Sequence, residues 1–134
     1  MRKLFIMCLI AVGMMFSSCT KQRGSYYVRY EVEAINNNGY GTSANIEILT
    51  DETLISKTIN GRFEEVYGPY SYNDSAYLKI SCNNGSYSWN TTQISGKIYV
   101  SKNEEPFVLK SEIHTGLGGS SNTDTCEISY TIDF

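Results

Sequence analysis

Apolar and polar residues alternate with a period of two along most of the chain after residue 25. The clearest run covers residues 26–34, where Tyr26, Val28, Tyr30, Val32 and Ala34 share one face and mostly charged residues occupy the other. Such alternation predicts a half-buried β-strand. After residue 25 no segment shows the 3.6-residue period of an amphipathic helix.

Similar patterns, separated by turn residues, predict further strands. These begin near residue 44 and cover residues 54–59, 76–82, 94–101, 107–114 and 126–134. Asn60-Gly61 predicts the turn of a β-hairpin. Residues 63–72 are less regular, and Gly68-Pro69 in their middle favours an edge strand or a bulge over a central strand.

The last three predicted strands have well-defined inward faces. We expect Ile94, Gly96, Ile98 and Val100 to share one face, as do Phe107, Leu109, Ser111 and Ile113, and as do Cys126, Ile128, Tyr130, Ile132 and Phe134. Seven or eight short strands in roughly a hundred residues predict one all-β domain, an immunoglobulin-like antiparallel sandwich of two sheets. A small closed barrel is the alternative, although a lipocalin-type barrel usually needs a longer chain.

The first eighteen residues have the composition of a targeting segment. Arg2 and Lys3 precede an apolar run from Leu4 to Phe16, and small residues follow before Cys19. This order of basic, apolar and small residues predicts a cleaved signal peptide over residues 1–18. The run is shorter than the roughly twenty residues that a membrane-spanning helix needs. We therefore expect a signal peptide (1–18), a modified N-terminus with a polar tether (19–25) and a β-sandwich domain (26–134).

Phe16-Ser17-Ser18-Cys19 resembles the lipobox of bacterial lipoproteins. Phe16 stands where leucine is usual, a departure that lipoproteins of the Bacteroides group tolerate. The resemblance implies that Cys19 becomes the mature N-terminus, carries diacylglycerol and a palmitate-type acyl chain, and anchors the protein in the outer membrane, because two or more acyl chains hold firmly. The tether has no acidic residue before Glu31, which favours the periplasmic face.

The mature domain is similar to the small immunoglobulin-like lipoproteins of the Bacteroides group. It also faintly resembles the MmpS-type transport accessory proteins, through residues 28–32, residues 98–100 and a cysteine in the closing strand. It departs from the latter at Cys82, which lies on an earlier strand than that family's partner cysteine, and at residues 102–105, which replace a characteristic Asp-Gly turn. Neither resemblance implies a catalytic residue.

Charge and cysteine usage narrow the classes of partner. Removing Arg2 and Lys3 from the eleven basic residues leaves nine against fourteen acidic residues, a formal net charge of −5. This balance argues against a nucleic-acid partner, which requires a dense basic face.

Cys82 and Cys126 form an even pair on inward positions and predict a disulfide, with two buried thiols as the alternative. No ligand set has zinc-like spacing, so we expect no metal and no cofactor.

Catalytic motifs are sparse. His114, the only histidine, is expected on a solvated face with no nucleophile motif nearby, and Gly116–Ser121 lacks the lysine and helix of a phosphate loop. The acidic pairs Asp51-Glu52, Glu64-Glu65 and Glu104-Glu105 leave a carbohydrate-active hydrolase as an alternative function, although that chemistry needs two carboxylates within one cleft. Asn73-Asp74 and Asp51-Glu52 offer clustered oxygen atoms for a calcium ion, but neither pair has the residue spacing of an EF-hand loop.

Aromatic residues provide the best candidate for recognition. Tyr67, Tyr70, Tyr72, Tyr87 and Trp89 lie near small polar residues, a mixture typical of binding surfaces. The alternative is that these tyrosines fill the core and leave their hydroxyls at its rim.

Asp74-Ser75-Ala76 also resembles the O-glycosylation site of Bacteroides-group proteins, with Ser75 as the acceptor, unless it is an ordinary turn closed by Asp74. The residues as a whole favour a non-catalytic binding or accessory module that engages an envelope protein or a glycan. A purely structural envelope component is the remaining alternative.

Overall fold

The computed structural model describes residues 24–36, 38–50, 53–82, 92–117 and 124–133, and within these ranges every regular element is a β-strand. The strands are β1 (Tyr26–Asn36), β2 (Ser43–Leu49), β3 (Leu54–Asn60), β4 (Arg62–Tyr70), β5 (Ser75–Cys82), β6 (Thr92–Lys102), β7 (Val108–Leu117) and β8 (Asp124–Thr131). The all-β prediction is confirmed.

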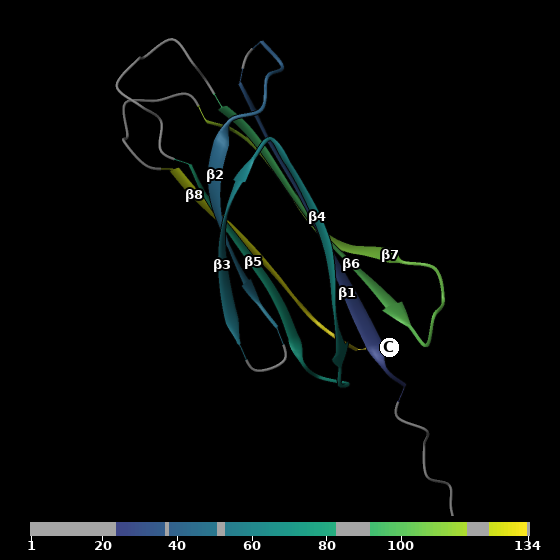
Figure 1. The fold of residues 1–134 in the computed structure, drawn as a ribbon. Coiled ribbons are helices and arrows are strands. Elements are labelled where there is room, and N and C mark those ends of the chain that lie inside the picture. The colour runs from purple at the N-terminus through teal and green to yellow at the C-terminus, as the bar shows by residue number, and fades with distance from the viewer. Residues whose placement is uncertain (1–23, 37, 51–52, 83–91, 118–123, 134) are drawn as a thin grey trace, which may run out of the picture.

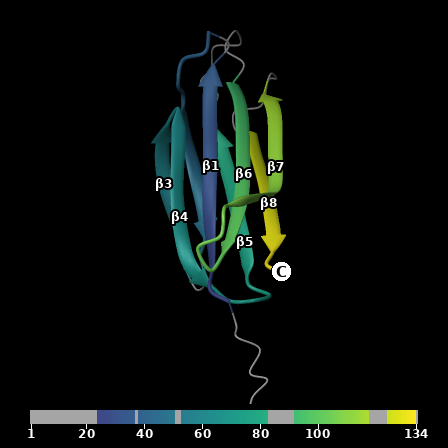
Figure 2. The same ribbon diagram turned by 90° about the vertical axis from the view of Figure 1, so that its right-hand side faces the viewer.

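The strands form two four-stranded antiparallel sheets that pack face to face (Figure 1). Sheet A has the order β4-β1-β6-β7, and sheet B has the order β3-β2-β5-β8. Figure 2 views the molecule from the side of sheet A, with β1, β6 and β7 side by side in front. Both sheets have open edges, so the fold is the predicted two-sheet sandwich and not a closed barrel.

The strand pairing has the immunoglobulin-like arrangement, with one departure. β1 pairs with β4, β2 pairs with β5, and β8 lies beside β5. These pairings match those of strands B with E, C with F, and F with G in immunoglobulin domains. The neighbour of β1 on its other side is β6, which follows late in the chain. The β6–β7 hairpin therefore occupies the position that the first strand has in an immunoglobulin domain.

The core consists of the inward residues of both sheets, and the predicted faces of β1, β5 and β6 are confirmed. Its fully buried members include Val28, Tyr30, Ile46, Ile48, Tyr70, Leu78, Ile80, Ile94, Ile98, Val100 and Ile132. The hydroxyls of Tyr30 and Tyr70 both donate to the carbonyl of Leu49, each at 3.1 Å. Burial raises the pKa of Tyr30 far above its ordinary value, so its hydroxyl stays neutral and acts as a donor.

The predicted hairpin at Asn60-Gly61 is wrong. β3 belongs to sheet B and β4 to sheet A, so this turn carries the chain from one sheet to the other. Gly61 has a φ of 83° and is held by two backbone hydrogen bonds, one from Ala34 at 2.7 Å and one to Thr42 at 3.0 Å. An Asn-Gly pair shows that a tight turn occurs, but the strands that the turn joins need not pair.

The irregular segment around Gly68-Pro69 is an edge strand, as predicted. β4 pairs only with β1, and its register shifts between Tyr26 and Val28. Gly68 has a φ of 146°, and a side chain there would contact the backbone of Tyr26. Proline lacks a backbone donor, so the edge of a sheet is where the ladder tolerates it.

The predicted alternation in β7 is wrong at its start. Ser111 pairs with Ile98, but the next pair joins Leu109 to Tyr99, so the register skips Lys110. This bulge turns Leu109 to the outer surface, where it is 42% exposed, and Phe107 contacts the outward-facing Arg29. Leu109 therefore lies on the outer face of sheet A, whereas Ser111 and Ile113 lie on its inner face.

Both long sides of the sandwich are closed by a lysine that contacts an aromatic ring. Lys57 of β3 lies over Tyr67 of β4, and both bond to the carboxylate of Glu65. On the opposite side, Lys110 of β7 lies over Tyr130 of β8, whose hydroxyl donates to Asp133. Each contact joins an edge strand of sheet A to one of sheet B.

Candidate binding face on the outer surface of sheet A

The described members of the predicted aromatic surface do not form one patch. Tyr70 is 2% exposed and belongs to the core, so the interpretation of this residue as a binding residue is wrong. Tyr67 is half-buried and packs edge-to-face against Tyr30, with ring centroids 5.8 Å apart. Tyr72 is exposed in the turn after β4. Tyr87 and Trp89 lie outside the described residues.

The two acidic pairs within the described ranges do not converge on one cleft. Glu65 points to the side of the sandwich and pairs with Lys57, whereas its neighbour Glu64 lies on the outer face of sheet A. Glu104 and Glu105 are exposed in the turn after β6, and residues 51–52 lie outside the described ranges. Asp74 accepts a hydrogen bond from the backbone of Ser71, as expected for an ordinary turn. Among the described residues, no three His, Cys, Asp or Glu side chains are placed to hold a metal ion.

Cys82 and Cys126 are both buried, and no disulfide joins them. Cys126 lies directly opposite Ile80 on β5, whereas Cys82 lies opposite Asp124. The two cysteines are therefore diagonal neighbours, and such neighbours lie about 7–8 Å apart, beyond the roughly 4.4–6.8 Å that separates bridged Cα atoms. The predicted disulfide is absent for this reason. Burial raises the pKa of the Cys126 thiol, which lowers its reactivity.

Two other predicted positions are on the surface. His114 is exposed on β7, as expected, and its Nε2 lies 3.4 Å from Oε2 of Glu112. Ser75 is exposed at the start of β5, so it is accessible to a modifying enzyme. Its O-glycosylation stays a prediction.

The outer face of sheet B is occupied by side chains that bond to one another. Four cross-strand pairs cover it: Thr58 with Asn45 at 2.8 Å, Lys79 with Glu47 at 3.1 Å, Tyr77 with Glu127 at 2.8 Å, and Ser81 with Thr125 at 3.3 Å. The bond to Glu127 raises the pKa of Tyr77 to about 12, so this pair is stable at neutral pH. These groups need no external partner.

The outer face of sheet A has a different character, which the strand register reveals. Three rows of side chains cross its four strands from β4 to β7: Arg62, Glu33, Ser95 and His114; then Glu64, Glu31, Lys97 and Glu112; then Val66, Arg29, Tyr99 and Leu109. We call them the serine row, the lysine row and the arginine row. Two rows are charged, and the third is mainly apolar.

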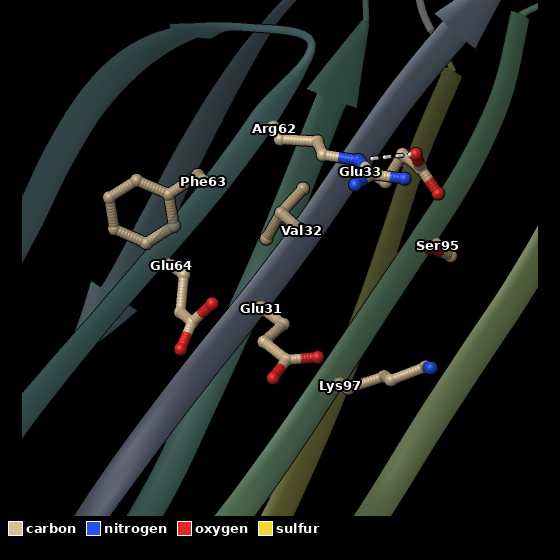
Figure 3. Close-up of a pocket in the computed structure, with 8 residues that line it drawn as sticks. All are labelled: Glu31, Val32, Glu33, Arg62, Phe63, Glu64, Ser95 and Lys97. Carbon is tan, nitrogen blue, oxygen red and sulfur yellow. Dashed lines mark hydrogen bonds and ion pairs between the residues drawn. The ribbon is translucent and has the colours of Figure 1, made fainter.

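Two adjoining hollows, each of about 350 Å³, cross the charged rows. The first lies over β4 and β1 and is lined by Glu31, Glu33, Arg62, Phe63 and Glu64 (Figure 3). The second lies over β6 and β7 and is lined by Gln93, His114 and Thr115. Both hollows share Glu33, Ser95 and Lys97, so we treat them as one trough. Ser95 makes room for it because its side chain is much shorter than those of its neighbours.

The charged groups of the trough differ in how fully they are paired. Arg62 donates to Glu33 at 2.7 Å, and Arg29 pairs with Glu31 at 3.0 Å. The carboxylate of Glu64 lies 3.9 Å from Arg29, at the limit of an ion pair, and its side chain is 63% exposed. Within the described part of the chain, no ion pair involves Lys97.

An apolar belt borders the trough along the arginine row. The guanidinium of Arg29 lies 4.3 Å from the ring centre of Tyr99 and 5.0 Å from that of Phe107. This stacking fixes the arginine on the surface. Val66 and Leu109, at the two ends of the row, are 50% and 42% exposed. Aromatic residues and arginine are the side chains enriched at protein interfaces.

The neighbouring Glu33, Ser95 and His114 do not make a catalytic triad. Such a triad needs the histidine between the serine and the carboxylate, whereas here the serine lies in the middle of the row. Glu33 is bound to Arg62, and His114 is exposed beside Glu112. This order follows from the register, and the sequence could not show it because the three residues are distant in the chain.

Comparisons with known proteins supply no relative: no protein-family model, no curated protein and no solved structure matches this chain. Within the described ranges, the structure contains no helix long and apolar enough to cross a membrane.

Proposed function

We propose that this chain is a lipid-anchored envelope protein and that it acts as a non-catalytic binding module through the trough and apolar belt of sheet A. The observation that carries the proposal is the contrast between the two outer faces. The polar groups on the outer face of sheet B bond to one another, whereas sheet A presents a hollow and, in the described part of the chain, a lysine without an ion pair, Lys97. A purely structural component would not need this asymmetry.

The anchor part of the proposal rests on the sequence around Cys19. Ser25 is held by Asn103 through two hydrogen bonds of 2.9 Å. The backbone N–H of Asn103 donates to the carbonyl of Ser25, and Oδ1 of Asn103 accepts from the backbone N–H of Ser25. The folded domain therefore starts at Ser25, six residues after Cys19, and so few residues reach at most about 20 Å. In this arrangement, the end of the sandwich at which β1 begins lies close to the membrane, so the domain can reach neighbouring envelope components.

The trough can be filled without disturbing the core. We expect Ser95→Trp to block it, because the side chain of Ser95 points outward at the junction of the two hollows. The matched control is Ser56→Trp, at an exposed position opposite Glu47 on the outer face of sheet B. Both variants should keep the urea midpoint of the native chain.

Affinity capture from detergent-solubilised envelopes then tests the proposal. The native chain and the Ser56→Trp variant should retain the same partner, and the Ser95→Trp variant should lose it. Equal retention by all three proteins would show that binding does not use this face. The absence of any specific partner for the native chain would refute the binding function itself.

A further inference from the structure

The two halves of the trough have different chemistry. The half over β4 and β1 contains the carboxylates of Glu31, Glu33 and Glu64, and Arg62 is already bound to Glu33. Glu31 is paired with Arg29, which leaves Glu64 as the exposed acceptor of this half. A cationic group is therefore favoured here.

The half over β6 and β7 is rich in donors. Lys97, Ser95, Gln93 and His114 line it, and its one carboxylate, Glu33, already accepts from Arg62. Because the one carboxylate of this half is already bound and, in the described part of the chain, Lys97 has no ion pair, an anionic acceptor is favoured.

Lys97 remains available although a glutamate lies opposite it on each neighbouring strand. Glu31 pairs with Arg29, and Glu112 lies beside His114. Figure 3 shows that Lys97 extends away from Glu31 and Glu64. The trough thus separates an available cation on β6 from an available carboxylate on β4, with β1 between them.

We propose that the trough binds a short zwitterionic peptide, with its carboxylate against Lys97 and Ser95 and its amino group against Glu64. This inference rests on the proposed binding function and names its ligand class. A purely anionic ligand would meet the three carboxylates of the β4–β1 half, and a purely cationic ligand would meet Lys97. A neutral glycan would leave both available charges without a partner.

Such a peptide has two sources with the same chemistry. A free peptide carries its amino group at its N-terminus, whereas a peptide branched from a larger envelope polymer has a blocked N-terminus and carries the amino group on a side chain. The probes Ala-Ala-Ala and acetyl-Ala-Lys-Ala represent these two cases. The C-terminal amides of both probes serve as their uncharged controls.

The experiment is a titration of the full-length chain in detergent micelles, followed by the amide chemical shifts of β6 and β7. At least one probe should bind, and its amide should bind about three- to tenfold more weakly, as expected for one charge-assisted contact at a partly exposed site. Lys97→Met should cause a similar loss. The matched control, Lys79→Met on sheet B, should leave the affinity unchanged.

Tighter binding of Ala-Ala-Ala would identify free peptides as the ligand, and tighter binding of acetyl-Ala-Lys-Ala would identify a branched peptide; either result supports the inference. It is refuted if the amides bind as tightly as the acids, if Lys97→Met has no effect, or if neither probe binds. If Ser95→Trp abolishes the capture of a partner but neither peptide binds, the proposed function stands and only the ligand class is overturned.

Discussion

Gly96 provides a quantitative test of how the two sheets pack. It faces inward from β6, directly beneath the trough, and is buried. A methyl group added at Gly96 would lie 2.8 Å from Cδ1 of Ile80 and 3.2 Å from Cδ2 of Leu78, both on sheet B. Carbon atoms in contact prefer about 3.5–4.0 Å, so the end of Ile80 must move by roughly 1 Å.

The energies of Gly96→Ala nearly cancel. Moving the side chain of Ile80 off its rotamer costs about 0.5–1.5 kcal/mol. Replacing glycine by alanine within a strand returns about 0.5–1 kcal/mol, because glycine loses more conformational freedom on folding. We therefore expect Gly96→Ala to change the free energy of unfolding by less than about 1 kcal/mol.

The informative variant combines Gly96→Ala with Ile80→Val. Ile80→Val alone removes a buried methyl group and should cost about 0.5–1.5 kcal/mol. In the double variant, the methyl group added at Gly96 no longer meets Cδ1 of Ile80 and fills part of the space that this atom leaves. The double variant should therefore be more stable than the sum of the single changes by about 1 kcal/mol, beyond the roughly 0.3–0.5 kcal/mol expected of independent sites.

Urea unfolding of the domain, residues 20–134, measures this coupling if all variants share one m-value. The control pairs Gly96→Ala with Ile132→Val, because Ile132 is equally buried but lies after β8, near Asp74. That pair should be additive. Additive energies for Gly96 with Ile80 would refute the packing of β6 against β5 through these residues.

Two further measurements test the side contact and the anchor. Hydrogen bonds from Lys57 and then Tyr67 hold the pKa of Glu65 below its ordinary value of 4.5, so Glu65 should stabilise the fold above pH 4.5 and lose this effect as the pH falls through its lowered pKa. The difference in urea midpoint between the native domain and Glu65→Gln should shrink accordingly, and a difference that grows on acidification would contradict the contact. Mass spectrometry of the membrane-purified chain should find acylated Cys19 at the N-terminus and a sugar on Ser75 that Ser75→Ala removes; an unmodified Met1 would refute the anchor.

The inward faces of β1, β5 and β6 could be predicted from the sequence, because the alternation of side chains along a strand is a local property. Val28, Leu78 and Ile98 each belong to a run of apolar residues spaced two apart, and all three are buried. The edge position of β4 was also visible, since proline marks it. Where the local rule failed, a bulge was responsible: nothing in residues 107–111 shows that Lys110 drops out of the register.

The binding face itself could not be predicted. Arg62, Glu33, Ser95 and His114 come from four strands, and they form one row only because β1 lies between β4 and β6. Sequence reasoning instead favoured a group of aromatic residues, and one of them, Tyr70, fills the core. A tyrosine suits either place, because its ring is apolar and its hydroxyl can bond to a backbone carbonyl.

The sequence by itself determined the strands, the buried faces of β1, β5 and β6, the sandwich class and the lipobox-like segment before the domain. Only the tertiary structure decided which strands are neighbours, that Asn60-Gly61 crosses between sheets, and that Cys82 and Cys126 are diagonal. It also showed that Lys97 has no ion pair with any other described residue. The physical reason is the range of the interactions. Side-chain alternation depends on adjacent residues, whereas cross-strand contacts depend on sheet order and register, which the whole core sets together.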